Sequence, residues 1–376
     1  MTPRAPTPRF SVAPMMAWTD RPYRRMMRRI TRHALLYTEM VTTGAVLHGD
    51  ADRHLARAEE TSPLALQVGG DDPDALAEVA RRALAYGYDE VNLNVGCPSD
   101  RVQRGRFGAC LMAHPDVVAR AVEAMRAAVP LPVTVKHRIG IDDADAYDDL
   151  RRFVDVVADA GADRFTVHAR KAWLQGLSPK ENRTVPPLRH DAVARLAAER
   201  PDLVIETNGG IQDLDGALAH LEDVASVMVG RAAYQMPMRW VDVDRRVFGA
   251  TAPAPTLRTV IDGMRDVVED ELVRGTRFAT VVKPMIALAR GVPGARGWRR
   301  TLSEGAHRPG AGPDLLDRAL ATLPDAVLDG VSDVAATGGE EGGGVGATDV
   351  GQEGGVVASA AAVSAASSSS GSTRSG

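Results

Sequence analysis

The chain has 376 residues, 44% of them hydrophobic and 25% charged, and its formal net charge is -4. That length exceeds one small domain, but a single (β/α)8 barrel commonly takes about 250 residues, so a barrel with an additional domain fits it. The composition is ordinary for a globular protein. The net charge gives no support for nucleic-acid binding, so any such role must rest on local clusters of basic residues.

The number of cysteines and the amino-terminal sequence bear on the cellular compartment of the protein. Cys97 and Cys110 are the two cysteines, too few for a disulfide framework, which suits a reducing cytosol. The first residues, MTPRAPTPRF, lack the apolar stretch of a signal peptide. The longest apolar runs have the length of strands and fall short of the roughly 20 residues of a membrane span. We therefore expect a soluble, cytoplasmic protein.

From residue 10 to about 248, short β-branched runs alternate with longer amphipathic ones. The runs predict strands at Ser11–Met16, Ala34–Thr38, Leu64–Val68, Glu90–Val95, Pro132–Lys136, Arg164–His168, Leu203–Thr207 and Ser226–Gly230. Helical patterns between them include Pro73–Tyr86, Pro115–Val129 and Tyr147–Ala160. Eight strands separated by helices indicate an α/β fold, the (β/α)8 TIM barrel. A doubly wound open sheet is the alternative, disfavoured because no G-x-G-x-x-G follows the first strand.

Polar residues or glycines stand at the carboxyl end of nearly every predicted strand. They are Met16, Glu39, Gln67, Asn94 with Cys97, Lys136, His168, Asn208 with Gly209 and Gly210, and Gly230 with Arg231. In TIM barrels this rim carries the active site. A purely structural protein has no reason to place Gln, Asn, Lys and His at one end of buried strands, so the pattern favours an enzyme.

The last two predicted strands end in glycines, Asn208-Gly209-Gly210 and Gly230-Arg231. Glycine lets the backbone approach a ligand closely, and backbone N–H groups can hold a phosphate. Because the loops after strands seven and eight are the usual phosphate site of this fold, we favour a phosphate over simple tight turns. The chain has no zinc-type cysteine spacing, no HExxH and no P-loop, so we expect an organic, phosphate-bearing cofactor and no metal.

Three rim residues carry candidate chemistry. Lys136 ends a buried strand, where lysine is rarely structural, and could neutralise an anion such as a reduced flavin. His168 falls on the same rim. Cys97, between Gly96 and Pro98, is predicted to present its thiol to the rim as nucleophile or proton donor, whereas Cys110 in GACLM resembles a buried, inert cysteine.

A second, helical domain is predicted after the barrel, so the domains are 10–250, 251–325 and a tail, 326–376. Between Arg274 and Arg308 the sequence holds eight basic residues and one acid, Glu304. Such a run is usually a solvated helix face, but the near absence of acids also fits contact with a polyanion. The tail is rich in Gly, Ala and Ser, which predicts disorder, with a partner-binding tail as the alternative.

Long motifs of this chain resemble those of tRNA-dihydrouridine synthases, most closely their DusA subfamily. The matching segments, which cover roughly residues 10–325, are VAPMM, YTEMVTTGA, ALQVGG, NLNVGCPSDRVQRGRFGACLM, VTVKHRIG, HARKAWLQGLSPKENR, NGGI, VMVGRAAYQMP and GVPGARGWRRTLSEGAHRPGA. The Cys97 segment and the HARKAW…SPKENR segment are long enough to make the resemblance specific.

The resemblance implies an FMN-binding barrel and a helical domain that docks tRNA. It assigns to FMN the residues Pro14, Met15, Met16, Gln67, Lys136, His168, Asn208, Gly209, Gly210, Gly230 and Arg231. It assigns to tRNA the residues Asn94, Lys180, Arg183, Arg296 and Arg299. Cys97 is implied as the general acid. The implied protein is a monomer that binds neither DNA nor membranes.

The implied reaction reduces the uracil of a D-loop uridine, at position twenty or its neighbour twenty-a. NADPH reduces FMN, hydride passes from the flavin to carbon 6 of uracil, and Cys97 protonates carbon 5 from the opposite side. A proton donor is needed because hydride addition leaves an enolate-like charge. The uridine must leave the tRNA stack, which costs a few kcal/mol that phosphate contacts can offset.

Three positions depart from the subfamily pattern: Ala17, where Asp is usual, His137 beside Lys136, and Lys283-Pro284 in place of Arg-His. Pro284 predicts a break or kink, since proline is not accommodated in a helix interior. The departures bear on substrate affinity and leave the chemistry intact.

Two other functions compete with this interpretation. A flavin barrel acting on a free pyrimidine would need neither the basic second domain nor the HARKAW…SPKENR segment. A non-catalytic RNA-binding protein on a retired barrel would have lost cofactor residues, yet Gln67, Cys97, Lys136, His168 and both glycine motifs are present.

Overall fold

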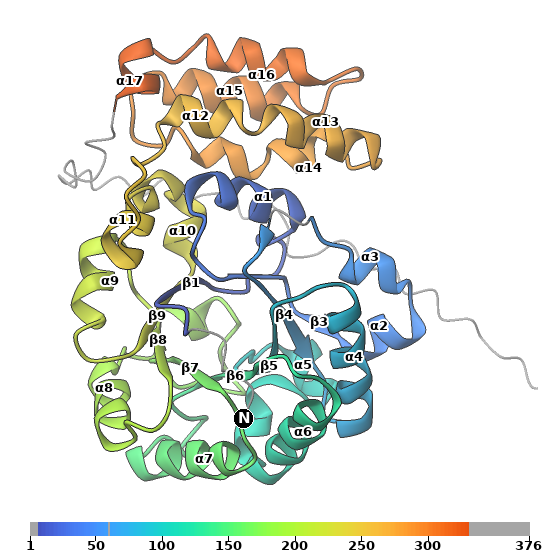
Figure 1. The fold of residues 1–376 in the computed structure, drawn as a ribbon, viewed down its shortest axis with the longest axis vertical. Coiled ribbons are helices and arrows are strands. Elements are labelled where there is room, and N and C mark those ends of the chain that lie inside the picture. Colours follow the sequence, from blue (N-terminus) through green and yellow to red (C-terminus); the bar gives the residue numbers. More distant parts are fainter. Residues whose placement is uncertain (1–6, 59–60, 331–376) are drawn as a thin grey trace, which may run out of the picture. The chain divides into compact units, whose positions relative to one another are not determined.

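The computed structural model describes residues 7–58 and 61–330 and contains a parallel barrel (Figure 1). Its strands are β1 (Phe10–Val12), β2 (Leu36–Tyr37), β3 (Val41–Thr42), β4 (Leu64–Gly69), β5 (Glu90–Val95), β6 (Val133–Arg138), β7 (Arg164–His168), β8 (Ile205–Asn208) and β9 (Ser226–Val229). They pair in the order β1-β9-β8-β7-β6-β5-β4-β2, and β3 also pairs with β4.

Closure comes from β1 and the residue that precedes β2. The N–H of Val12 donates to the carbonyl of Leu35 at 2.9 Å, and the N–H of Leu35 donates to the carbonyl of Phe10 at 3.1 Å. Because β2 and β3 both pair with β4, they occupy one position of the barrel. The eight positions confirm the predicted (β/α)8 architecture.

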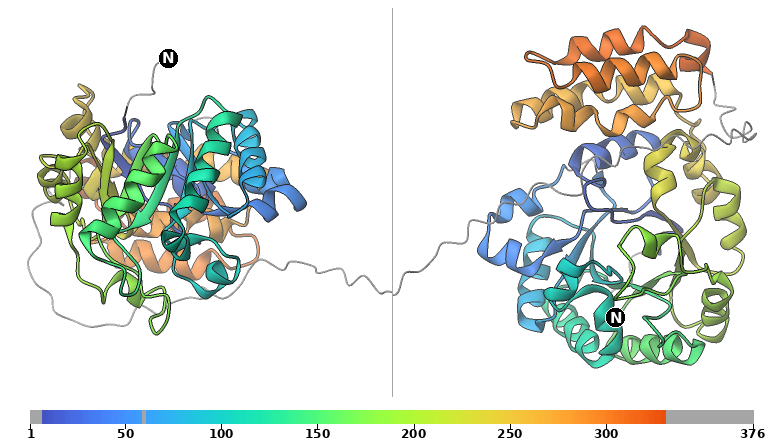
Figure 2. Two further views of the ribbon diagram at one scale, coloured as in Figure 1. Left: turned by 90° about the horizontal axis from the view of Figure 1, so that it is seen from below. Right: turned by 180° about the vertical axis from the view of Figure 1, so that it is seen from behind.

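Helices surround the strands (Figure 2). Those of the barrel are α1 (Arg21–Ile30), α2 (Thr43–His48), α3 (Ala51–Leu55), α4 (Pro73–Ala85), α5 (Asp100–Arg104), α6 (Pro115–Ala128), α7 (Tyr147–Asp159), α8 (His190–Glu199), α9 (Leu214–His220), α10 (Arg231–Gln235) and α11 (Val243–Phe248), with short 3-10 helices η2 (Gly108–Ala113), η3 (Glu181–Arg183) and η4 (Pro237–Trp240). In the described part of the chain, no helix has the length and apolar character needed to span a bilayer.

Strand β5 shows why the barrel forms. Val91, Leu93 and Val95 are fully buried and belong to the apolar core shared with the helices. The alternate residues Glu90, Asn92 and Asn94 carry the polar contacts of the barrel interior. Successive strand residues point to opposite faces, so one sequence serves both layers. Here the strand is buried on both faces but apolar on only one.

Most predicted boundaries agree with the structure, and the first strand is the clearest correction. It was predicted at Ser11–Met16, but β1 ends at Val12. Pro14 lacks the N–H that a continuing ladder needs. Beyond it the chain turns, because the N–H groups of Trp18 and Thr19 both donate to the carbonyl of Met15. Residues 14–16 therefore form a rim loop.

A buried ion-pair cluster fills the barrel at the amino ends of its strands. Arg164 donates to both carboxylate oxygens of Glu90 at 2.7 Å and lies 3.8 Å from Glu206. Glu206 also accepts from the hydroxyls of Ser11 at 2.7 Å and Ser226 at 2.8 Å. Each residue is at most 5% exposed. Buried charges are tolerated when paired and hydrogen-bonded in this way.

A helical region follows the barrel. It consists of α12 (Leu257–Asp262), α13 (Arg265–Val273), α14 (Phe278–Val282), η5 (Pro284–Ala287), α15 (Ala295–Gly305), α16 (Pro313–Leu320) and α17 (Asp325–Asp329). Helix α14 stops before Lys283, and Pro284 opens the next 3-10 helix, as the proline predicts. Trp298 is fully buried, and its indole N–H donates to the carbonyl of Met285 at 3.0 Å. The indole therefore joins α15 to η5 within the core of this region.

The predicted tail begins too early. Residues 326–329 belong to helix α17, whose Leu328 is 2% exposed, so they are ordered. Burial of the apolar Leu328 side chain stabilises this short helix against the core. The prediction missed it because the residues that follow are rich in Gly, Ala and Ser. The remainder of the predicted tail, 331–376, lies outside the described residues.

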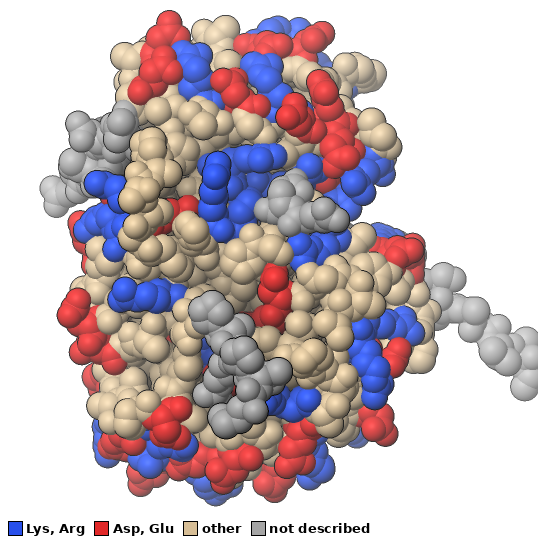
Figure 3. Space-filling view, in the orientation of Figure 1, with Lys and Arg blue, Asp and Glu red and all other residues tan. Residues whose placement is uncertain are grey.

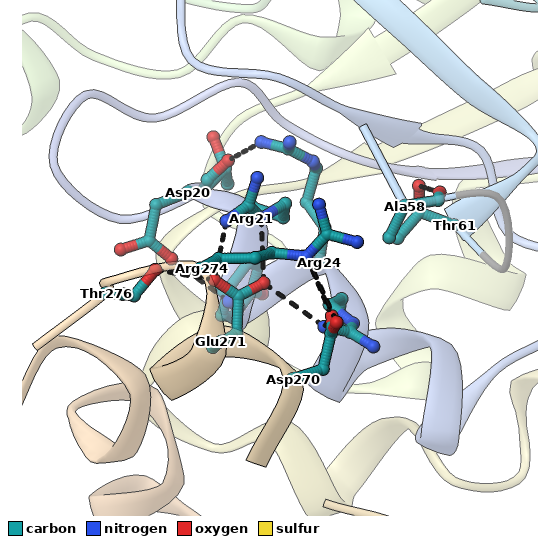
Figure 4. A network of polar contacts seen from close by, with 12 residues as sticks. Asp20, Arg21, Arg24, Ala58, Thr61, Asp270, Glu271, Arg274 and Thr276 are labelled. Carbon is teal, nitrogen blue, oxygen red and sulfur yellow. Dashed lines mark hydrogen bonds and ion pairs between the residues drawn. The ribbon is translucent and has the colours of Figure 1, made fainter. Parts of the chain in front are cut away.

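Helix α1 joins the barrel to the helical region through arginines (Figure 4). Arg21 forms a two-point ion pair with Glu271 of α13, with both N–O distances at 2.7 Å, and Arg25 contacts Asp270 and Glu271. The hydroxyl of Thr276 adds a hydrogen bond to Glu271 at 2.8 Å. On the face drawn in Figure 3, Lys and Arg gather over the part of the fold where α1 lies in Figure 1.

Glu271 is fully buried. Burial acts to raise its pKa, but the hydrogen bonds from Arg21 and Thr276 outweigh this effect, so the pKa of Glu271 is lowered. A carboxylate with a lowered folded-state pKa stabilises the fold above its unfolded-state pKa, near 4.3 for Glu, and this contribution is lost as pH falls through the folded-state value.

We predict that Glu271→Gln lowers the free energy of unfolding by about 3 kcal/mol at pH 7, because it leaves Arg21 and Arg25 without their buried carboxylate. Urea unfolding followed by circular dichroism at pH 7 and at pH 3.5 measures the difference. The difference between wild type and variant should shrink at the lower pH. An equal difference in unfolding free energy at pH 7 and pH 3.5 would show that the charge of the Glu271 carboxylate does not cause the stabilisation.

Candidate active site

Strand register brings the predicted rim residues together. Asn94 of β5 is paired with Lys136 of β6, and His168 of β7 is paired with Asn208 of β8. The ammonium of Lys136 donates to the side-chain oxygen of Asn208 at 3.1 Å. Four of the residues selected from sequence therefore lie at one end of neighbouring strands, where a TIM barrel carries its active site.

A hydrogen-bonded series of side chains connects this rim to the buried ion pairs. Asn94 donates to Gln67 at 2.9 Å, Gln67 donates to Asn92 at 2.8 Å, and Asn92 donates to Thr134 at 2.8 Å. Thr134 donates in turn to Glu90, the partner of Arg164. We call these residues, with Glu206, the interior polar network. Because each amide has defined partners on both sides, the network fixes which atoms of Gln67 and Asn94 face the rim.

The same asparagine orients Cys97. The side-chain oxygen of Asn94 accepts from the N–H of Gly96 at 3.1 Å and from that of Cys97 at 3.0 Å. Gly108 packs tightly on the loop, since a Cβ there would lie 2.5 Å from the Cys97 carbonyl, and its φ is +78°. The half-buried Cys97 thiol lies 3.6 Å from the hydroxyl of Ser99. The loop that carries the thiol is thus held from both sides.

Cys110 differs from Cys97 in its surroundings. Its thiol donates to the carbonyl of Phe107 at 3.2 Å, and burial raises its pKa. A raised pKa keeps the thiol protonated, which suits the inert cysteine expected from the sequence.

Lys136 supplies the positive charge of the rim, and His168 does not add to it. Burial lowers the pKa of Lys136 to about 8, with the charge of Arg138 acting in the same direction. Lys136 forms no ion pair with a carboxylate anywhere in residues 7–58 or 61–330. Burial, followed by the charges of Arg138 and Lys136, lowers the pKa of His168 well below its ordinary value, so His168 is neutral at pH 7. The rim offers a cation without an acidic partner.

The loop after β8 can only be built from glycine. The φ angles of Gly209 and Gly210 are +120° and +72°, values that side chains disfavour. A Cβ on Gly209 would lie 2.8 Å from the His168 ring, and one on Gly210 would lie 2.4 Å from Leu188. At Gly230 a Cβ would meet only ordinary contacts with Ala13 and Met15. Close approach of the backbone is therefore required after β8 and is not required after β9.

Two arginines lie beside this loop. Arg170 donates to the carbonyls of Thr184 and Pro186, and Arg231 donates to that of Arg183 at 3.3 Å. Burial lowers the pKa of Arg170, and the charge of Arg231 lowers it further. Neither makes an ion pair with a carboxylate among the residues described. Two neighbouring guanidinium groups without an acid form a site suited to an anion.

Arg138 connects the loops of the rim. Its side chain is 3% exposed and donates to the carbonyls of Gly96 at 3.0 Å, Lys171 at 3.0 Å and Asn182 at 2.9 Å. Gln103 adds a second connection by donating to Pro98 and Leu174. The loop that carries Cys97 and the loop 169–189 are therefore held together.

Other predicted residues lie on the loops around this cluster or on the helical region, and Arg183 touches the cluster through Arg231. Met16 is 50% exposed on the loop after β1, Lys180 and Arg183 lie at η3, and Arg296 and Arg299 are on the exposed face of α15. Arg274 of the basic run is paired with Asp270, an acid outside that run. An acidic side chain therefore lies next to this basic run in the fold, although Asp270 is outside the run in the sequence.

Two of the three departures from the subfamily pattern touch each other. The ammonium of Lys283 donates to the carbonyl of Ala17 at 3.0 Å, and the N–H of Ala17 donates to Glu39. Ala17 has a φ of +60°. His137 instead points away from the barrel interior, with its ring 4.9 Å from Phe153 and 6.0 Å from Phe165 between centroids. His137 is therefore a core residue, whereas Lys283 connects the helical region to the rim.

Sequence reasoning missed Asn92, Arg138, Arg170 and His190, whose roles depend on partners distant in sequence. The alternation of EVNLNV could have revealed Asn92, which shares a face with Asn94. No group of three or more His, Cys, Asp or Glu side chains placed to hold a metal occurs in the described part of the protein.

The architecture and the position of the polar cluster define a TIM-barrel enzyme. The chain belongs to the dihydrouridine synthase (Dus) family, whose model matches residues 11–324. It is 56% identical over 311 residues to the tRNA-dihydrouridine(20/20a) synthase of Synechocystis sp., a match that covers 83% of this chain and 93% of that one. The enzymes of the same name from Yersinia pestis and Vibrio cholerae are each 52% identical, over 88% and 84% of this chain and 95% and 97% of theirs.

We predict that Arg138→Met loosens both loops of the rim, because three loop carbonyls, of which that of Asn182 is buried, lose their donor. A loss of about 2 kcal/mol of local stability corresponds to roughly thirtyfold faster amide exchange. Hydrogen exchange of peptides covering 94–113 and 169–189 measures it, with Arg81→Met on the surface of α4 as the control. Unchanged exchange in both segments would remove Arg138 as the connection between them.

Proposed function

We propose that this protein is a tRNA-dihydrouridine synthase that reduces the 5,6 double bond of uridines 20 and 20a in the D-loop. The proposal assigns FMN as the bound cofactor and NADPH as the reductant. Family membership and the names of its relatives support the reaction. The observation that carries it is the rim, where Cys97, Lys136, His168 and the Gly209–Gly210 loop converge.

The residues present fit FMN. The Gly209–Gly210 loop leaves no room for side chains, Arg170 and Arg231 have no acidic partner among the described residues, and Lys136 is a buried cation. We assign the phosphate to Asn208, Gly209, Gly210, Gly230 and Arg231, and the ring system to Pro14, Met15, Met16, Gln67, Lys136 and His168. Arg170, next to Arg231, is added to the phosphate residues.

When bound, reduced FMN supplies the hydride that adds to carbon 6 of uracil. Cys97 then acts as the general acid and donates its proton to carbon 5, which discharges the enolate-like charge. Asn94 holds the backbone of Cys97 in place and is itself 8% exposed. His168 is neutral and adds no positive charge of its own, so Lys136 is the cation that balances the reduced cofactor.

For the tRNA we assign Asn94, Lys180, Arg183, Arg296 and Arg299. Extruding the uridine costs a few kcal/mol, which arginine–phosphate contacts on η3 and α15 can offset. Lys283 donates to the Ala17 carbonyl in the loop after β1, and η5, which follows Lys283, packs against α15. These contacts connect α15 to the rim. In this account residues 10–250 are catalytic and residues 251–325 dock tRNA, in a cytoplasmic monomer.

We predict that Cys97→Ala keeps FMN and tRNA affinity but reduces dihydrouridine formation by about 100-fold or more, since it removes the general acid. Single-turnover reduction of tRNA by the flavin-loaded variant measures the effect. Cys110→Ala is the matched control, because the Cys110 thiol donates a hydrogen bond to the carbonyl of Phe107.

Normal turnover by Cys97→Ala would contradict the proton-donor role. Equal losses in both cysteine variants would indicate a general effect on the fold. Neither result bears on the assignment of FMN to the barrel, which is tested separately by measuring FMN binding.

We predict that Arg296→Ala combined with Arg299→Ala weakens tRNA binding and lowers the slope of log affinity against log salt by about one to two, because two phosphate contacts are lost. Both side chains are exposed, so the fold should persist. Filter binding between 50 and 300 mM KCl measures the slope, with exposed Arg81→Ala as control. An unchanged slope would remove α15 from the tRNA-docking surface.

A further inference from the structure

His190 lies directly behind the Gly209–Gly210 loop. It is the first residue of α8, and its ring reaches β8 on the outer side of the barrel. One ring nitrogen, Nε2, is 2.8 Å from the carbonyl oxygen of Gly209, and the other, Nδ1, is 2.9 Å from the hydroxyl of Thr207. A single side chain thus connects the last outward residue of the strand to the loop that follows it.

The chemistry of these contacts defines the state of the ring. A carbonyl oxygen can only accept, so Nε2 of His190 carries a proton and donates it to Gly209. Burial, and next the charge of His220, lower the pKa of His190. The ring is therefore neutral at pH 7, and Nδ1 accepts from the hydroxyl of Thr207. Both partners match the neutral Nε2–H tautomer.

The surroundings hold the ring in this position. The ring of His220 lies against it, with centroids 4.2 Å apart. A cavity of about 130 Å³ adjoins both histidines and is lined by Asp191, Ala194, Asp223 and Val224 besides His190, Thr207 and His220. Among the described residues the Gly209 carbonyl accepts no other hydrogen bond, so loss of the imidazole leaves it free to turn.

The opposite side of the loop is held from inside the barrel. The side-chain amide of Asn208 donates to the carbonyl of Met228 at 2.8 Å and accepts from Lys136. Asn208 thus fixes where the loop begins, while the glycines after it have no side chains to hold them. Two consecutive glycines are the most flexible element a backbone can contain, and their order must come from contacts of their main chain.

We propose that His190 is a positioning residue for the cofactor phosphate: by holding the Gly209 carbonyl outward, it directs the N–H of Gly210, which belongs to the same trans peptide, toward the rim. The inference rests on the proposed FMN site. It predicts a selective effect, because this loop would hold only the phosphate of FMN. Riboflavin shares the ring system and lacks the phosphate, so its binding is independent of His190.

The test is flavin titration of the full-length apoprotein, followed by quenching of flavin fluorescence, with FMN and riboflavin in parallel. His190→Leu should weaken FMN binding about tenfold and change riboflavin binding by less than about twofold, since the hydrogen bond that holds the Gly209 carbonyl is lost. His190→Gln, whose amide can donate to Gly209, should recover most of the FMN affinity. His220→Leu, which removes the ring packed against His190 without touching the loop, is the matched control.

Equal loss of FMN and riboflavin affinity in His190→Leu would overturn the positioning role in favour of a general packing role. Unchanged FMN affinity would overturn it outright. If the leucine variant does not fold, His190→Asn, which is polar and shorter, replaces it with the same expected selectivity. A wild-type protein that binds neither flavin would instead overturn the proposed function, and this inference with it.

Discussion

The interior polar network is the constraint on which the rest of the site depends. A TIM-barrel interior is ordinarily filled by branched apolar side chains. Here Arg164, paired with Glu90 and near Glu206, occupies it instead. Buried charges of this kind are tolerated when they are paired and hydrogen-bonded, and here Arg164 is bonded to Glu90, while its Nε makes no hydrogen bond among the described residues. The hydrogen bonds continue through Asn92 and Gln67 to the rim, so the orientation of the Gln67 and Asn94 amides follows from a salt bridge at the far end of the barrel.

Above the network, the rim is assembled from loops that have little regular structure of their own. Arg138 and Gln103 hold the loop of Cys97 against the loop 169–189, and Asn94 orients the cysteine backbone. The result is a thiol, a buried cation and a glycine loop held by strands and side chains. Such a site needs little reorganisation on binding, which is the form of preorganisation that catalysis by charge stabilisation requires.

The residue pattern predicted the barrel and the rim well, for physical reasons. Strands Glu90–Val95 and Arg164–His168 agree with prediction at both ends, because β-branched residues alternate with polar ones between turn-forming segments. Residues 14–16 were misjudged because apolar character alone does not show where Pro14 ends a ladder. The sequence did not reveal the roles of Arg138 and His190, because both side chains donate to backbone carbonyls of distant loops, and every residue has such a carbonyl. The pairing of Arg274 with Asp270, by contrast, has the i,i+4 spacing of a helix and could have been predicted; a count of charges between Arg274 and Arg308 left Asp270 out.

The most direct test of this account is the reaction itself. Purified protein is incubated with NADPH and tRNA that lacks dihydrouridine, and the product is mapped by mass spectrometry of nuclease fragments. The account predicts a gain of two hydrogens on uridine at position 20, position 20a or both. A yellow, flavin-loaded protein that forms no dihydrouridine at either position would contradict it and would redirect the search to another tRNA site or to a free pyrimidine.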